Sequence, residues 1–186
     1  MASLSNSFFI LHLPLLLLLL LLHFSSSLST TLIEITCKST SYPDFCVAAI
    51  SSTSPQTSST TDTRDLSSIF LSLALSNATN SSSYATSLAA SAMTEEPIRP
   101  LLRACSLKYA AAGDALNWAL RELSAESYDN AFVHASAAAE YPIACRMLFA
   151  QQRRKPTALY PPELGRMEEE LRRLCTVALE IISLLG

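Results

Sequence analysis

The helical character of this chain is clearest in residues 101–123, LLRACSLKYAAAGDALNWALREL. Apolar or small side chains recur there at intervals of three and four residues, which places them along one face of an α-helix. The positions on this face are Leu102, Cys105, Tyr109, Ala112, Leu116, Ala119 and Leu123. Such a face is the seam of a helix that packs against nearly antiparallel neighbours, so the stretch predicts a helical bundle.

Three further segments complete an antiparallel four-helix bundle over residues 62–186. The next seam along the chain is Tyr128, Ala131, Ala135, Ala138, Pro142, Cys145 and Phe149. The last seam is Leu164, Met167, Leu171, Leu174, Ala178, Ile181 and Leu185. The first bundle helix is expected over 63–94, with the smaller seam Phe70, Ala74, Ala78, Ser81, Ala85, Leu88 and Ala92. No run alternates with a period of two, so the predicted fold class is all-α.

Residues 1–27 are predicted to be a signal peptide. Eight leucines at 15–22 precede three serines at 25–27, and this order is typical of a secretory leader with its cleavage site. The cut is expected after Ser27; a cut two residues later is nearly as good, and an uncleaved anchor is the alternative. We therefore expect a single mature domain, residues 28–186, that is secreted and has no membrane attachment.

A helical hairpin is predicted ahead of the bundle, over residues 28–50. Cys37 and Cys46 enclose eight residues, and such a pair in an exported protein predicts a disulfide. The hairpin breaks at Tyr42-Pro43, because the residue before a proline disfavours helix. The polar stretch SSTSPQTSSTT at 51–61 is predicted to be the loop that follows.

The other cysteines have different expected roles. Cys105 and Cys145 both lie on predicted seams, so we favour a disulfide between them, although the sequence alone permits other pairings. By loop entropy the bridge between Cys37 and Cys46 contributes about 2.7 kcal/mol, and the longer bridge about 4 kcal/mol. Cys175 lies beside the last seam and is predicted to be a buried free thiol, with an intermolecular disulfide as the alternative.

Scarce residue types argue against catalysis, metal sites, cofactors and nucleic acid. Three glycines leave no phosphate-binding loop and no Gly-x-Ser-x-Gly motif. His134 is the only histidine after the leader, so no metal site with several histidines can form. We expect it to be a partly exposed helix residue, with a pH-sensing role as the alternative. The net charge of −3 does not suit a phosphate-neutralising surface.

Two asparagines are candidates for N-linked glycans in an exported protein. Asn77-Ala78-Thr79 and Asn80-Ser81-Ser82 both match the acceptor motif. Asn80 lies further from the predicted seam and is the better candidate. A glycan there would leave that face of the helix solvated.

Several motifs occur together in this chain in a recognisable order. They are Cys37 through Cys46 with Ser41-Tyr42-Pro43 between them, Cys105-x-x-x-Tyr109, Asp114-x-Leu116, Ala119-Leu120, Leu123, Tyr128-Asp129-x-Ala131, Ser136-Ala137-Ala138 and Cys145. In these the chain resembles the plant invertase and pectin methylesterase inhibitor family over essentially its whole mature length. The resemblance implies a four-helix bundle with an N-terminal helical hairpin and two disulfides, in the pairing favoured above.

The resemblance also implies a function and a partner. Members of the family are not enzymes; they bind secreted carbohydrate-active enzymes and block access of the substrate. The chain ends at Gly186 with no catalytic module attached, so it is expected to be a free-standing inhibitor. We expect a monomer that forms a 1:1 complex with its target in the cell wall space.

Two departures from the family pattern bear on the target. Arg146 stands where the family often has an acidic residue after its fourth cysteine. Invertase inhibitors often carry Pro-Lys-Phe, which reaches into the invertase site, where this chain has Tyr128-Asp129-Asn130. The missing lysine and aromatic residue favour pectin methylesterase as the target, with acid invertase as the alternative.

The target interface is expected at polar positions off the seams of the first three bundle helices. The candidates are Ser72, Ser83, Thr86, Asn117 and Ser127. Pectin methylesterases resembling the family's partners use carboxylates in their substrate groove, so binding is expected to change between about pH 5 and 7.5. A small-ligand carrier, which needs an accessible apolar cavity, and a receptor-binding signal are the other functional classes.

Overall fold

The computed structural model describes residues 32–53, 62–151 and 159–186. Its main helices are α2 (Pro43–Thr53), α3 (Thr63–Ala90), α4 (Arg99–Ser124), α5 (Tyr128–Gln151) and α6 (Pro162–Ile182). A short helical segment at 32–38 precedes α2, and the described ranges contain no strand. The predicted all-α fold class is therefore confirmed. The predicted signal peptide and its cleavage site lie outside the described residues.

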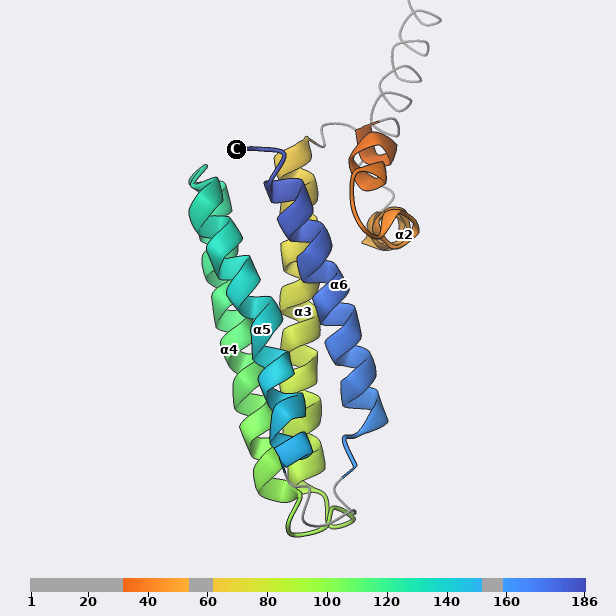
Figure 1. Cartoon of the computed structure of the whole chain (residues 1–186), viewed down its shortest axis with the longest axis vertical. Helices are drawn as coiled ribbons and strands as arrows, with labels where there is room; N and C mark the ends of the chain where they lie inside the picture. Colours follow the sequence, from red (N-terminus) through yellow and green to blue (C-terminus); the bar gives the residue numbers. More distant parts are fainter. Residues whose placement is uncertain (1–31, 54–61, 152–158) are drawn as a thin grey trace, which may run out of the picture.

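The helices α3, α4, α5 and α6 form an up-and-down bundle, and α2 lies beside one end of it (Figure 1). In the bundle α3 packs against α4 and α6, and α5 packs against the same two helices. α3 and α5 are therefore diagonal to each other, as are α4 and α6. This arrangement decides which pairs of helices can form one continuous outer surface.

The predicted seams form the core of the bundle. Every predicted seam residue of α4 is buried, and so is every one of α5 except the half-buried Tyr128. Pro142 lies inside α5, and the helix continues through it to Gln151. In α6 and the turn after it, Met167 and Leu185 are half-buried and the other seam residues are buried. These side chains therefore fill the interior of the bundle.

The buried side of α3 contains two serines, which the structure accommodates without unpaired polar atoms. Ser67 and Ser81 are both fully buried. The Oγ of Ser67 donates to the carbonyl of Thr63 at 3.2 Å, and the Oγ of Ser81 donates to the carbonyl of Asn77 at 2.8 Å. Small side chains that satisfy their own hydroxyls can replace apolar ones at a helix contact.

The sequence predicts α3 to residue 94, but the helix ends at Ala90. The hydroxyl of Thr94 donates to the carbonyl of Leu88 at 2.7 Å, and the guanidinium of Arg99 donates to that of Ser91 at 3.4 Å. These side chains supply hydrogen bonds that another helical turn would have made. The predicted seam position Ala92 is consequently exposed.

The boundary between the hairpin and the following loop also differs from the prediction. α2 continues to Thr53, three residues beyond the predicted end of the hairpin. The hydroxyls of Ser51, Ser52 and Thr53 donate to backbone carbonyls one turn earlier. These side chains satisfy their hydroxyls within the helix, so the polar stretch can remain helical where its composition suggests a loop. The rest of the predicted loop, 54–61, lies outside the described residues.

Three kinds of contact fasten the hairpin. A disulfide joins Cys37 to Cys46 inside it, with a Cα–Cα distance of 5.5 Å. The backbone N–H of Ser41 donates to Glu180 Oε2 on α6 at 2.8 Å, and the hydroxyl of Ser41 donates to the same carboxylate. The ring of Tyr42 lies 5.7 Å from the guanidinium carbons of two α6 arginines, Arg172 and Arg173. The Ser41-Tyr42-Pro43 motif thus holds the hairpin turn against α6.

A second disulfide joins Cys105 of α4 to Cys145 of α5, with a Cα–Cα distance of 4.8 Å. The sequence separation is 40 residues for this disulfide and 9 residues for the one between Cys37 and Cys46.

We expect Cys105→Ala/Cys145→Ala to lower the free energy of unfolding by about 4 kcal/mol, and Cys37→Ala/Cys46→Ala by about 2.7 kcal/mol, because the larger loop regains more entropy. Urea unfolding of both double variants measures this order. A reversed order would show that the loss depends on local packing instead.

Cys175 is a free thiol in the core of the bundle. Its side chain is fully buried on α6. Burial raises the pKa of the Cys175 thiol to about 12, so the reactive thiolate is scarce near neutral pH.

We expect the folded protein to give no reaction with Ellman's reagent at about pH 8, because the Cys175 thiol is both shielded and protonated. After unfolding in guanidinium the same protein should give one thiol per chain. Cys175→Ala is the control and should give none in either state. Rapid reaction of the folded protein, or a disulfide-linked dimer on a non-reducing gel, would contradict this burial.

Candidate functional site

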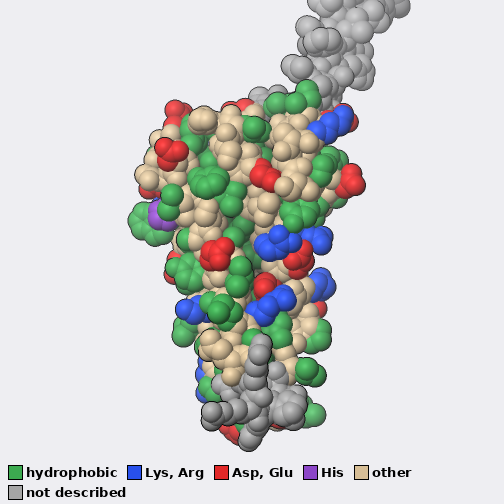
Figure 2. Space-filling model, in the orientation of Figure 1, with side chains coloured by type: hydrophobic (Ala, Val, Ile, Leu, Met, Phe, Trp, Pro, Cys, Tyr) green, Lys and Arg blue, Asp and Glu red, His purple; other side chains and the backbone are tan. Residues whose placement is uncertain are grey.

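Exposed large hydrophobic side chains are distributed unevenly around the bundle. Among the described residues none belongs to α3 or α6. The exposed ones on α4 and α5 are Leu107, Trp118, Phe132, Val133, Ile143 and Met147, which together define the α4–α5 face. Figure 2 shows hydrophobic side chains reaching the surface over α5 and at the edge over α4. A concentration of apolar surface on one side of a small protein marks an interaction site.

The composition of α5 explains this surface. Its sequence, YDNAFVHASAAAEYPIACRMLFAQ, is apolar on all sides rather than along one stripe. When one side packs into the bundle, the opposite side must therefore expose apolar residues. In contrast, α6 directs charged side chains outward and pairs several of them along its own length, as Arg166 with Glu163 and Arg172 with Glu169.

An aromatic cluster lies at the junction of α4 and α5. The ring of Trp118 on α4 is stacked with that of His134 on α5, with a centroid separation of 6.2 Å and an interplanar angle of 25°. The guanidinium carbon of Arg121 lies 4.8 Å from the centroid of the Trp118 ring. Half of the Trp118 side chain is nevertheless exposed. Partly exposed tryptophan held in place by its neighbours is typical of the anchor residues of protein interfaces.

Sequence reasoning missed Trp118 and Arg121. His134 is half-buried, as expected. The sequence did contain evidence that Trp118 is exposed. It follows the seam position Leu116 by two residues, so its side chain points away from the core. A tryptophan at such a position has to be exposed unless another element covers it.

The structure divides the predicted interface residues into two groups. Ser72, Ser83 and Thr86 are exposed on α3, away from α5. The hydroxyl of Thr86 already takes part in a contact between helices, since its Oγ1 lies 2.7 Å from the Oγ of Ser106 on α4. The exposed Asn117 is next to Trp118 in the chain.

Ser127 belongs to the turn between α4 and α5, where its Oγ accepts a hydrogen bond from Asn130 at 3.0 Å. Of the five predicted residues, it and Asn117 belong to α4 and the turn that follows it. The group on α3 occupies a different side of the bundle.

The end of the bundle at which α5 begins is acidic. Asp129 is exposed in the first turn of α5. Glu126 of the preceding turn pairs with Arg64 of α3, with 3.1 Å between Nη1 and Oε1. Nearby, Asp62 and Asp65 form the capping box at the start of α3. Asp129 therefore presents its carboxylate to solvent at this end of the bundle.

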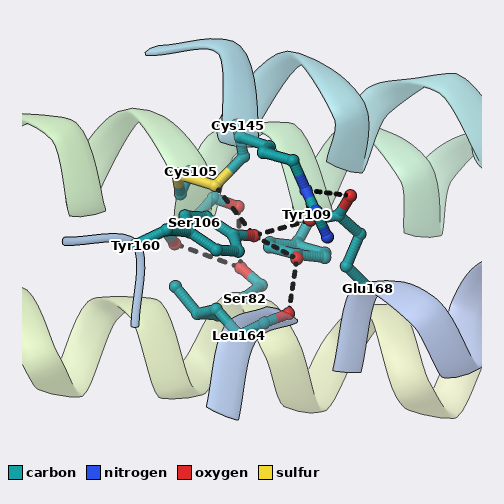
Figure 3. The surroundings of a disulfide bond; sticks show 9 residues. Ser82, Cys105, Ser106, Tyr109, Cys145, Tyr160, Leu164 and Glu168 are labelled. Carbon is teal, nitrogen blue, oxygen red and sulfur yellow. Dashed lines mark hydrogen bonds and ion pairs between the residues drawn. A yellow bond between two sulfur atoms is a disulfide. The ribbon is translucent and has the colours of Figure 1, made fainter. Parts of the chain in front are cut away.

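A polar cluster surrounds the disulfide between α4 and α5 (Figure 3). The hydroxyl of Tyr160, which precedes α6, donates to Glu168 Oε2 at 2.9 Å. Arg146 Nε donates to Glu168 Oε1 at 2.9 Å. The hydroxyl of Tyr109 on α4 lies 3.3 Å from that of Tyr160 and 3.4 Å from the carbonyl of Leu164. The cluster therefore links α4 and α5 to α6.

Both tyrosines in this cluster stay protonated. Burial raises the pKa of Tyr109 to about 12, and burial is also the main cause that raises the pKa of Tyr160. Their hydroxyls therefore remain hydrogen-bond donors at any physiological pH. The cluster has the properties of a structural support beneath the α4–α5 face.

Among the described residues, no group of histidine, cysteine, aspartate and glutamate side chains is placed to hold a metal ion.

Arg146 has a structural role that accounts for one departure from the family pattern. Its partner Glu168 is only 7% exposed, so that carboxylate depends on Arg146 and Tyr160 for compensation. The basic residue after Cys145 is therefore matched by an acid on α6.

In the described residues, no helix is both long enough and apolar enough to cross a membrane.

The fold is shared with two crystal structures of a pectin methylesterase inhibitor from Arabidopsis. One has a TM-score of 0.59 at 18% identity and covers 83% of this chain and 95% of that chain. The other, of a mutant form, has a TM-score of 0.64 at 19% identity and covers 81% and 94%. These similarities concern the fold alone, which is that of a disulfide-linked helical bundle.

The sequence profile described as "Plant invertase/pectin methylesterase inhibitor" matches residues 31–181. The chain belongs to this family, as the motifs of the sequence predict. It is 39% identical to "Cell wall / vacuolar inhibitor of fructosidase 2" of Arabidopsis thaliana, over 96% of both chains. It is 44% identical to "Pectinesterase inhibitor 28" of Oryza sativa subsp. japonica, over 84% of this chain and 70% of that relative.

We expect Arg146→Ala to lower the free energy of unfolding by about 1–2 kcal/mol, because it leaves the buried carboxylate of Glu168 without its charged partner. Arg166→Ala is the matched control, since the pair that Arg166 forms with Glu163 is exposed. The control should unfold at the wild-type urea concentration within error. Equal effects of the two substitutions would show that the Arg146 pair is an ordinary surface pair.

Proposed function

We propose that this protein is secreted into the cell wall space and inhibits a plant carbohydrate-active enzyme by covering its substrate cleft with the α4–α5 face. Its membership of an inhibitor family supports this function, and the two relatives are named as inhibitors. The observation that carries the proposal is the concentration of exposed hydrophobic side chains on α4 and α5 alone among the bundle helices. Inhibition of this kind requires binding and no catalytic group.

The proposed mechanism depends on a rigid surface. A standard protein interface buries roughly 1,600 Å² in total. The disulfide between Cys105 and Cys145 and the Tyr109–Tyr160–Glu168 cluster hold α4, α5 and α6 in place before binding. Because little ordering remains to be done on association, more of the contact energy appears as affinity.

Trp118 is proposed as the central anchor of this surface. Its ring is already oriented by His134 and Arg121, so its insertion into a cleft of the target would cost little rotamer entropy. Asn117 and Ser127, in α4 and the turn after it, would extend the contact. We infer a 1:1 complex with a monomeric inhibitor, because a single α4–α5 face is available on each chain.

Pectin methylesterase is the preferred target. The overall identities do not decide the question, since both kinds of inhibitor are found among the relatives. The local chemistry of α5 favours the esterase, because Asp129 stands where invertase inhibitors often present lysine. Inhibition of acid invertase is the alternative, and the relative that matches over 96% of both chains supports it.

We expect the oxidised mature protein to abolish the activity of a plant pectin methylesterase at a 1:1 ratio and to leave a plant acid invertase active. The expected affinity differs between about pH 5 and 7, because carboxylates that lie close together in an enzyme groove share protons and titrate above their usual range. Titration of inhibitor into each enzyme at both pH values measures this. Inhibition of invertase alone would transfer the function to the alternative target, and inhibition of neither would remove the proposal.

We expect Trp118→Ala to weaken binding to the inhibited enzyme by about 30-fold, which corresponds to about 2 kcal/mol for an anchor residue. Ser83→Ala on α3 is the matched exposed control and should bind as the wild type does. Surface plasmon resonance gives both affinities, and circular dichroism verifies that each variant is folded. A loss of binding with Ser83→Ala but not with Trp118→Ala would move the interface to α3.

A further inference from the structure

A groove separates the hairpin from the bundle on the side away from the α4–α5 face. Its volume is about 430 Å³, and it lies between α2, α3 and α6. That volume falls in the range of about 300–1,000 Å³ that is usual for small-ligand sites. α2 touches the bundle far less extensively than the bundle helices touch one another. The hairpin is thus packed less tightly against the bundle than the bundle helices are against one another.

The lining of the groove is both apolar and polar. Phe45 of α2 and two α6 residues, Met167 and Leu174, supply apolar surface. Arg166 and Glu170 of α6 supply charged groups that can donate and accept hydrogen bonds. A sugar ring has one apolar face of C–H groups and a rim of hydroxyls, so this combination suits a carbohydrate.

Both glycan acceptor motifs of the chain lie on this groove. Asn77 and Asn80 of α3 are among its lining residues. Asn80 is exposed, whereas Asn77 is half-buried. The Oδ1 of Asn77 accepts a hydrogen bond at 3.3 Å from the hydroxyl of Ser81, a residue with no exposed surface. A large group on Asn80 needs no rearrangement, but one on Asn77 would disturb a contact with the core.

We propose that Asn80 carries an N-linked glycan whose first N-acetylglucosamine lies in this groove and braces α2 against α3 and α6. This inference rests on the proposed secretion. In the transfer, Nδ2 of Asn80 bonds to the anomeric carbon of a lipid pyrophosphate-linked oligosaccharide. The bond from that carbon to the phosphate oxygen breaks, the lipid pyrophosphate leaves, and the amide loses one proton.

The attachment point makes the groove the natural place for the sugar. Because Asn80 is itself part of the groove wall, the first sugar is tethered beside the site at a high effective concentration. The position also fits the proposed inhibition, since α3 is diagonal to α5 and the glycan would leave the α4–α5 face uncovered. The glycan then supports the hairpin without obstructing the target.

The acceptor is identified by secretion of the full chain from yeast, together with Asn80→Gln and the matched control Asn77→Gln. Intact mass before and after treatment with endoglycosidase H reports the glycan. We expect one glycan on the wild type and on Asn77→Gln, and none on Asn80→Gln. A glycan that disappears with Asn77→Gln, or a secreted wild type without one, would overturn the assignment.

The position of the sugar is tested by hydrogen exchange. Endoglycosidase H leaves one N-acetylglucosamine on the asparagine, so three samples are compared: glycosylated, trimmed and Asn80→Gln. Amides of 43–53 are expected to exchange about fivefold more slowly in the first two, as for a tethered sugar that fills its site about four-fifths of the time. Amides of α4 and α5 should not change.

Equal exchange of 43–53 in all three samples would overturn the placement in the groove. Protection in the glycosylated sample alone would also overturn it, because the first sugar would then not be the bracing group. Neither measurement involves an enzyme, so a failure of the proposed inhibition would not alter these results. The two proposals can therefore fail separately.

Discussion

The covalent link between α4 and α5 is the constraint on which the rest of the structure depends. The disulfide between Cys105 and Cys145 fixes the register of two helices whose mutual contact is among the most extensive in the bundle. Around it, the hydroxyls of Tyr109 and Tyr160 and the carboxylate of Glu168 connect the same pair to α6. Displacement of either helix would disrupt both the disulfide and these hydrogen bonds. The outer surface of α4 and α5 is therefore held in one shape.

The two sides of the bundle differ in chemistry because their helices differ in composition. α3 presents serine, threonine and asparagine, and residues 66–94 contain no charged side chain. α6 presents arginine and glutamate in pairs, and Figure 2 shows these charges gathered along it. α5 has too few polar residues to cover its outer side, so it leaves the apolar surface on which the proposed inhibition depends. The groove beside α2, which suits a sugar, lies on the polar side.

Errors in the predicted boundaries arose where side chains form hydrogen bonds to the backbone. The hydroxyl of Thr94 and the guanidinium of Arg99 end α3 four residues before the predicted position. Hydroxyls near Thr53 prolong α2 into a stretch whose composition suggests a loop. Both effects depend on individual rotamers, which periodicity does not encode. The predicted interface was incomplete because it contained only polar positions off the seams, and so it left out the exposed Trp118.

The sequence by itself determined the helical seams, the places of Cys105 and Cys145 on them, the burial of Cys175 and the family. These follow from local spacing and composition, because a residue three or four places from its neighbour lies on the same helix face in any packing. Only the tertiary structure decided that α3 is diagonal to α5, that Arg146 meets Glu168, and that Trp118 stacks on His134. Each of these depends on how separate helices are arranged around the core. That arrangement is set by packing between residues distant in the chain, which no local pattern specifies.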